Sequence, residues 1–165
     1  KPLFLLSMLS ARKSRFIDEI FLSTDSKKIN KIAKKNGFKT EKLRQKKLSG
    51  SKSMTKDVVF DVIKKTKKKY DYFILLQPTS PLRSVKDIDN SIKITIKKNL
   101  NSLVSVNKSN QKINGAIYIQ KINYFIKKKF FYYKNTYKFN MPPKRSIDID
   151  TLKDFKKLSK YENNR

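Results

Sequence analysis

The 165-residue chain is long enough for one domain with a sizeable hydrophobic core, and its 38% of apolar residues fits a globular protein. It contains neither cysteine nor histidine, which excludes thiolate zinc sites, disulfides, Cys–His pairs and Ser–His–Asp triads. Any catalysis must therefore use carboxylates, lysine, arginine, hydroxyls, backbone amides or a metal ion with oxygen ligands. No apolar run reaches the ~18 residues of a membrane span, so no such span is predicted and residence in the cytoplasm is expected.

The formal net charge of +28, with 41 basic and 13 acidic residues, is compatible with nucleic-acid binding. However, 35 of the basic residues are lysines and only 6 are arginines, and they are spread along nearly every segment. Base reading and bidentate phosphate binding favour arginine. Asn, Ile, Phe and Tyr are abundant while Ala, Gly and Pro are scarce, as an AT-rich coding sequence would produce. Compositional drift is therefore favoured over a selected nucleic-acid surface, and a nucleic-acid partner is not expected.

The first predicted elements are a strand and a helix. Phe16–Thr24 is a β-rich run that ends in hydroxyls and Asp25. Ser26 then precedes a stretch in which apolar residues recur at helical spacing, closed by Asn36–Gly37 as a C-cap. Strand, acidic turn and helix form half of a βαβ unit.

The alternation continues along the chain. Strands are predicted at about 17–23, 72–77, 102–106 and 115–119, and helices near 27–36, 55–69 and 85–98. Residues 121–141 are mixed, consistent with a short helix and two strands. Ser146–Asp150 alternates as a strand, and Thr151 and Asp154 form a capping box for a final helix. This order predicts a three-layer α/β fold around a mostly parallel sheet.

The loop QPTSPLR at 77–83 is the most informative candidate site. It follows a buried strand, and Pro78 and Pro81 stiffen it while Thr79 and Ser80 offer hydroxyls and backbone N–H groups. Ligands in open α/β sheets bind at the carboxyl ends of strands, so the loop suits a nucleotide. An ordinary proline-bounded connection explains the same residues equally well.

A second candidate is Asp148 with Asp150. In a strand these carboxylates share one face, where they repel each other unless a cation such as Mg²⁺ joins them. A solvated strand face with Asp150 helping to cap the next helix is the competing explanation. Asp25 also ends a predicted strand, although helix capping explains that segment better. The run Phe130–Tyr133 has rings able to stack on bases, but strand core is favoured.

Taken together, these segments resemble the acylneuraminate cytidylyltransferases, which activate sialic acid, legionaminic acid and related nine-carbon sugars. The matching segments occur in the family's order: FIDEIFLSTDS at 16–26, LLQPTSPLR at 75–83, NGAIYI at 114–119 and SIDIDT at 146–151. The similarity covers roughly residues 1–106 and 112–161. The combination of these motifs is specific, whereas any one of them alone is weak.

The resemblance implies a Rossmann-like, glycosyltransferase-A-like nucleotidyltransferase fold. It also implies transfer of CMP from CTP to a 2-keto sugar acid with release of pyrophosphate, in a homodimer. Carried over residue by residue, Arg44, Gln77, Thr79 and Ser80 would bind the nucleotide, Lys112 and Asn114 the sugar, and Asp148 and Asp150 the Mg²⁺ ion. Lys112 stands where the family usually has arginine, which keeps the charge but loses the bidentate fork.

Two departures from the family shape the expectations. The chain starts just after the place of the family's first strand and triphosphate-binding loop, and only Asn107–Gln111 separates the strand at 102–106 from KINGAIYI. The expectation is thus a single nucleotidyltransferase domain over 1–165 that lacks those segments. A degenerate, non-catalytic homologue and a basic nucleic-acid-binding protein are the alternatives.

Overall fold

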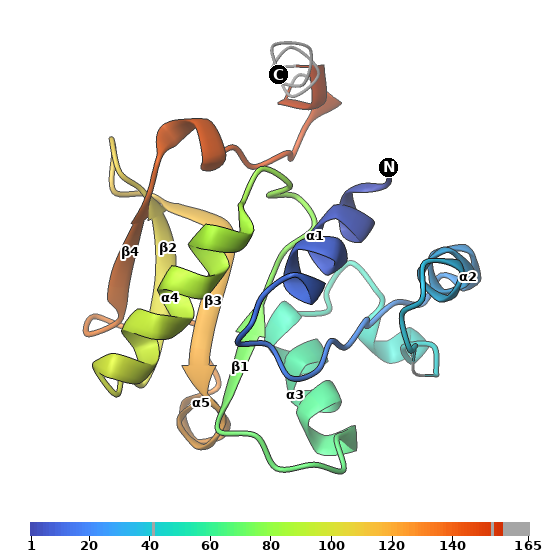
Figure 1. Cartoon of the computed structure of the whole chain (residues 1–165). Helices are drawn as coiled ribbons and strands as arrows, with labels where there is room; N and C mark the ends of the chain where they lie inside the picture. Colours follow the sequence, from blue (N-terminus) through green and yellow to red (C-terminus); the bar gives the residue numbers. More distant parts are fainter. Residues whose placement is uncertain (41, 153, 157–165) are drawn as a thin grey trace.

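The computed structural model describes residues 1–40, 42–152 and 154–156 (Figure 1). Its described elements before residue 72 are all helical, and helices and strands mix only after that point. The helices are α1 (Leu3–Arg12), α2 (Lys27–Lys35), α3 (Thr55–Lys65), α4 (Val85–Lys97) and α5 (Ile122–Lys128), with short 3-10 helices η1 (Lys46–Leu48) and η2 (Pro143–Arg145). The strands are β1 (Tyr72–Leu75), β2 (Ser102–Asn107), β3 (Ile113–Lys121) and β4 (Tyr137–Met141).

The four strands form one sheet in the order β1-β3-β2-β4. β3 is antiparallel to both β1 and β2, and only β4 pairs in parallel, with β2. The expectation of a mostly parallel sheet is therefore wrong for these pairs. β1 and β2 do run in the same direction and are joined through α4, as in a βαβ unit. However, the short turn after Asn107 sends β3 back antiparallel into the gap between them.

Local capping explains where the predicted helices begin. Ser26 accepts a hydrogen bond from the backbone N–H of Ile29 at the start of α2. At the start of α4, Ser84 and Asp87 form a capping box in which each side chain accepts from the other residue's N–H. α3 ends at Lys65, earlier than predicted, because Thr66 leaves the helical conformation. The capping box of Thr151 and Asp154 is also present.

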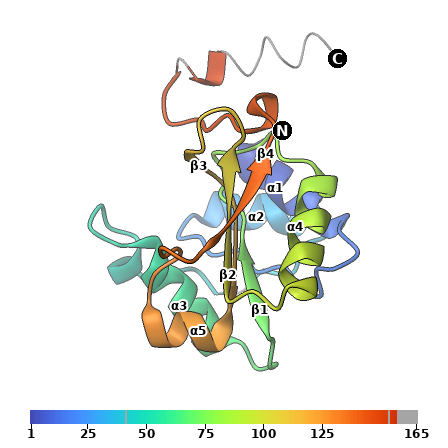
Figure 2. The same ribbon diagram turned by 90° about the vertical axis from the view of Figure 1, so that its left-hand side faces the viewer.

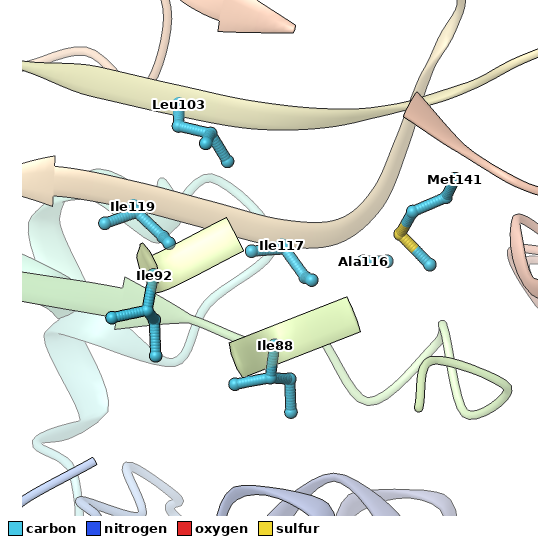
Figure 3. Packing of buried hydrophobic residues seen from close by; sticks show 7 residues of the cluster. All are labelled: Ile88, Ile92, Leu103, Ala116, Ile117, Ile119 and Met141. Carbon is cyan, nitrogen blue, oxygen red and sulfur yellow. The ribbon is translucent and has the colours of Figure 1, made fainter. Parts of the chain in front are cut away.

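The layers follow from which side chains each helix buries. α4 packs Ile88 and Ile92 against β2 and β3, where Leu103, Ile117 and Ile119 complete the main core (Figure 3). On the opposite face, Phe125 of α5 contacts Phe73 of β1 edge to face. Figure 2 shows α3 and α5 on this side of the sheet and α4 on the other. A second, smaller core joins α1 to α2 and the residues after it, through Leu5, Met8, Ala33 and Phe38.

Two predicted strands are not formed. Residues 17–23 make no strand ladder with any described residue; Ile20 and Leu22 instead pack beside the smaller core. Residues 146–150 also remain outside the sheet, because the two prolines and η2 carry the chain away from β4. Their single backbone bond to the 77–83 loop runs from Ile149 N–H to the Thr79 carbonyl, at 2.8 Å. Apolar and polar residues alternate in both segments, but neither segment pairs with a strand among the described residues.

The opening apolar stretch forms α1, which the sequence did not predict as a helix. The mixed region 121–141 resolves into α5 and the single strand β4. None of the helices built from the described residues is long and apolar enough to cross a membrane.

Candidate active site

The candidate site lies where the 77–83 loop, the start of β3 and the 146–150 segment meet. Ser80 is fully buried at this point. Its hydroxyl lies 3.1 Å from the carbonyl oxygen of Asn114 and 3.3 Å from Oδ1 of Asp148, so it can donate to either. Together with the bond from Ile149 to Thr79, these contacts join the loop to the aspartate-bearing segment, although 68 residues separate Ser80 from Asp148 in sequence.

Arg83 stabilises the conformation of the 77–83 loop. Its guanidinium is buried and donates to the carbonyl oxygens of Gln77 and Ser80. Burial lowers the pKa of Arg83 to about 10, although the nearby charge of Asp148 acts to raise it. Arg83 therefore stays protonated at neutral pH. Its Nε and Nη1 atoms find no hydrogen-bond partner among the described residues.

Gly115 marks the tightest point of the site. Its φ is +70°, in the left-handed region that favours glycine. A Cβ atom added there would lie 2.6 Å from Gln77 Oε1, 3.1 Å from Asp148 Oδ2 and 3.4 Å from Ser80 Oγ. Three polar side chains from two distant segments therefore surround one backbone position that has no side chain of its own.

Asn114 connects this point to the core. Its Oδ1 accepts from Ser105 Oγ at 2.5 Å, and its Nδ2 donates to Ser146 Oγ at 3.0 Å. The Asn114 side chain is buried, and its amide is occupied by these internal partners. Asn114 thus ties β2 and β3 to the start of the 146–150 segment.

A second interaction, between Arg145 and Asp87, holds the chain directly before the 146–150 segment. Arg145 binds the buried carboxylate of Asp87 with two hydrogen bonds, of 2.7 and 2.9 Å. Burial acts to raise the pKa of Asp87, but hydrogen bonds from Arg145 and Ser84 outweigh it and hold that pKa below its ordinary value. One carboxylate therefore caps α4 and also anchors η2, directly before the candidate metal-binding aspartates.

Asp148 is half-buried beside Ser80, whereas Asp150 is exposed. Within the part of the chain that the structure describes, neither forms a salt bridge and no group of three or more His, Cys, Asp or Glu side chains is placed to hold a metal. Because 146–150 is not a strand, the structure does not support the expectation that Asp148 and Asp150 share one face; the charge of Asp148 lies near that of Arg83.

The remaining predicted residues lie elsewhere. Arg44 contacts Asp25 at 3.5 Å and Ser49 at 3.1 Å, which joins the segment before α2 to that before η1. Lys112 is exposed in the turn before β3. No contact among the described residues links Arg44, Asp25 or Lys112 to the group around Gly115. The structure thus brings together Gln77, Thr79, Ser80, Asn114 and Asp148. Within the described ranges, it leaves four predicted residues outside their hydrogen bonds and salt bridges: Arg44, Asp25, Lys112 and the exposed Asp150.

Four residues that shape this site were not among those predicted for it: Arg83, Gly115, Asp87 and Arg145. The Ser84–Asp87 spacing is a capping-box signal that was available. No local sequence pattern predicts that Arg145 binds Asp87, which lies 58 residues away in the sequence.

The chain is similar to known proteins in sequence and in fold. The cytidylyltransferase family model matches residues 1–164. The "CMP-N,N'-diacetyllegionaminic acid synthase" of Legionella pneumophila is 29% identical over 94% of this chain and 82% of its own length. The "N-acylneuraminate cytidylyltransferase" of Streptococcus agalactiae serotype V is 26% identical over 94% of this chain, which spans only 46% of that relative.

Solved structures share the fold at low identity. A CMP:2-keto-3-deoxy-manno-octonic acid synthetase complexed with CTP superposes with a TM-score of 0.77 at 12% identity, covering 99% of this chain and 88% of that one. The 4-diphosphocytidyl-2C-methyl-D-erythritol synthase of Anaerococcus prevotii gives a TM-score of 0.70, also at 12% identity, covering 98% of this chain and 89% of that one. The expected nucleotidyltransferase-type α/β fold is thereby confirmed, and the chain belongs to the cytidylyltransferase family.

Proposed function

We propose that this chain carries the transfer site of an enzyme that moves CMP from CTP to a nine-carbon 2-keto sugar acid of the sialic or legionaminic type, releasing pyrophosphate. The family match supports nucleotidyl transfer, and the names of the Legionella and Streptococcus relatives support the sugar class. The alternative of a nucleic-acid-binding module is not favoured by these matches.

The observation that carries the proposal is the convergence around Gly115. The Gln77 amide, the Ser80 hydroxyl and the Asp148 carboxylate all face the space above a backbone with no side chain. Because glycine has no side chain, these three polar groups from two distant segments can gather against the main chain at one point. It lies at the carboxyl end of β1, the edge where α/β sheets bind nucleotides.

The residues present also fit a magnesium ion. Asp148 and Asp150 offer oxygen ligands and form no salt bridge in the described region, although the charge of Arg83 lies near Asp148. Mg²⁺ is commonly held by one or two carboxylates plus substrate phosphates. We assign the ion to Asp148 and Asp150. When bound, Mg²⁺ supplies positive charge against the charge that develops on the α-phosphate.

The other residues receive roles that follow from their contacts. Gln77 and Thr79 bind the nucleotide from a loop that Arg83 holds in shape, and the fully buried Ser80 serves this binding by joining the loop to Asp148. Asn114 borders the sugar site and acts mainly by positioning the 146–150 segment, since its amide is engaged with Ser105 and Ser146. Arg44 and Lys112 lie outside these contacts, and their proposed roles in binding the nucleotide and the sugar rest on the family resemblance alone.

The test is pyrophosphate release by the complete gene product. CTP with Mg²⁺ and either N-acetylneuraminate or N,N'-diacetyllegionaminate should give CMP-sugar and pyrophosphate, whereas ATP in place of CTP should give neither. Tight CTP binding without product from either sugar would overturn the sugar class. If CTP neither binds nor reacts, the chain is a non-catalytic homologue and the proposed function is wrong.

A further inference from the structure

The face of the sheet opposite α4 carries a surface that the transfer site does not use. It is formed by α3 with the preceding Met54, and by α5 with the residues that follow it; we call it the α3–α5 surface. Figure 2 shows the two helices next to each other, below β2 and far from the C-terminal segment that carries Asp148. The surface is therefore accessible while the candidate site is occupied.

Three contacts between ammonium groups and aromatic rings build this surface. Lys56 Nζ lies 4.9 Å from the ring centroid of Phe130, while Phe60 has Lys64 Nζ at 4.7 Å and Lys129 Nζ at 6.0 Å. Lys56, Phe60 and Lys64 are spaced four residues apart, so they form a stripe along one side of α3. The stripe meets the end of α5 through Lys129 and Phe130.

Large apolar side chains are exposed around the same contacts. The exposed fractions are 56% for Met54, 41% for Ile126, 57% for Phe130 and 56% for Tyr132. α3 itself buries none of its residues fully, although it is amphipathic. Exposed apolar groups gathered in one place, rather than scattered singly, mark a contact surface.

The charge of this surface is predominantly positive. Residues 54–69 and 122–134 contain two aspartates, Asp57 and Asp61, and Asp61 is paired with Lys65 at 2.5 Å. The same residues contain ten lysines: 56, 64, 65, 67, 68, 69, 127, 128, 129 and 134. A partner must therefore be anionic. A second copy of this chain does not qualify, because it carries the same surplus of positive charge.

We propose that the α3–α5 surface docks on a membrane that contains anionic lipid. Ile126, Phe130 and Met54 enter the headgroup region, and the surrounding lysines lie over the lipid phosphates. A nucleic acid fits less well. Stacking on bases needs free ring faces, whereas lysines lie over the rings of Phe60 and Phe130. The two segments also contain no arginine, the residue suited to bidentate phosphate binding. Binding to a lipid interface requires neither free ring faces nor arginine.

Vesicle co-sedimentation tests the proposal with variants of exposed residues. The protein should bind vesicles of phosphatidylcholine with phosphatidylglycerol and not vesicles of phosphatidylcholine alone. The triple variant K127Q/K128Q/K129Q should bind about a hundredfold more weakly at about 0.1 M salt. The double variant I126S/F130S, which keeps every charge, should also lose at least about tenfold, because its apolar insertion is gone.

A matched charge control is K28Q/K31Q/K35Q on α2, which Figure 1 shows on the far side of α3 from α5. It removes the same charge at sites expected to face away from the lipid, beyond the Debye length of ~10 Å, so it should weaken binding less than about tenfold. Equal losses from both triple variants, or unchanged binding by I126S/F130S, would show general charge attraction and overturn the proposal. Tighter binding to a single-stranded oligonucleotide than to anionic vesicles, lost in the same variants, would identify nucleic acid instead. Thermal unfolding of each variant checks that the fold is retained.

Discussion

Gly115 is the residue on which the site geometry depends most directly. Replacement by alanine places Cβ 2.6 Å from Gln77 Oε1 in a backbone conformation with φ +70°. We expect G115A to cost about 1–3 kcal/mol of unfolding free energy and to weaken CTP binding. The control is G50A, whose Cβ would meet only Ser53 Oγ, at 3.9 Å. Urea unfolding measures the stability of the two variants, and calorimetric titration measures their CTP binding. Equal stability of the two variants would contradict the crowding inferred at Gly115.

Asp148 and Asp150 carry the prediction about the metal. In the complete gene product, D148N/D150N should abolish Mg²⁺-dependent pyrophosphate release. The unfolding midpoint should change little, because no salt bridge in the described region is broken and an amide oxygen can still accept the hydrogen bond from Ser80. The control is D71N, which alters an exposed acid before β1. Turnover at the parental rate in the double variant would show that other residues hold the ion.

The same residues show what sequence can and cannot predict about a site. The hydroxyls after β1 and the paired aspartates were singled out from their residue types and positions. Their meeting was not predictable from local pattern, because it depends on Arg83, Asn114 and Arg145, each of which bonds to groups set by the tertiary fold. Buried hydrogen bonds between residues distant in sequence leave no periodic pattern in the sequence.

Among the elements, α4 and η2 are coupled through Asp87, and the coupling depends on pH. Because the folded pKa of Asp87 is held below its ordinary value of 3.8, its contribution to stability is present above about pH 4. It is lost as the pH falls through the lower, folded pKa. We expect D87N to lose about 2 kcal/mol at pH 7 and to approach the parent near pH 2.

Urea titrations of parent and D87N at the two pH values provide the measurement. D61N is the matched control, because it breaks the exposed pair with Lys65 and should cost less than about 1 kcal/mol. A pH-independent difference between parent and D87N would mean that the Asp87 carboxylate contributes by shape alone.

Helices were easier to predict than strands because a helix satisfies its own backbone, while a strand needs a neighbour. α2 and α4 carry their caps in sequence, and both were predicted to within one residue. Residues 17–23 and 146–150 have the apolar alternation of strands but no partner among the described residues. The direction of β3 was also missed, although the five-residue polar turn before it favours a hairpin over a parallel crossover.

At the scale of the whole molecule, the net charge of +28 opposes compaction. Raising NaCl from about 0.01 to 0.3 M shortens the screening length from ~30 Å to below 8 Å. We expect the unfolding free energy to rise by about 1 kcal/mol, which for this chain length corresponds to about 2–4 °C in melting temperature. Calorimetry in NaCl, with sucrose as an uncharged comparison, measures the effect. A melting temperature that falls with salt would contradict self-repulsion.

The insertion of β3 between β1 and β2 has a consequence for the order in which the chain folds. β2 and β3 are joined by a short turn and can pair early, because little chain entropy is lost in closing it. β1 has no place in the sheet until that hairpin exists, since β3 is its only neighbour there. Its docking must then close a much longer stretch of chain, the kind of non-local contact that slows folding. We therefore expect the loop that follows β1 to reach Asn114 last, so that the candidate site is completed in the final step of folding.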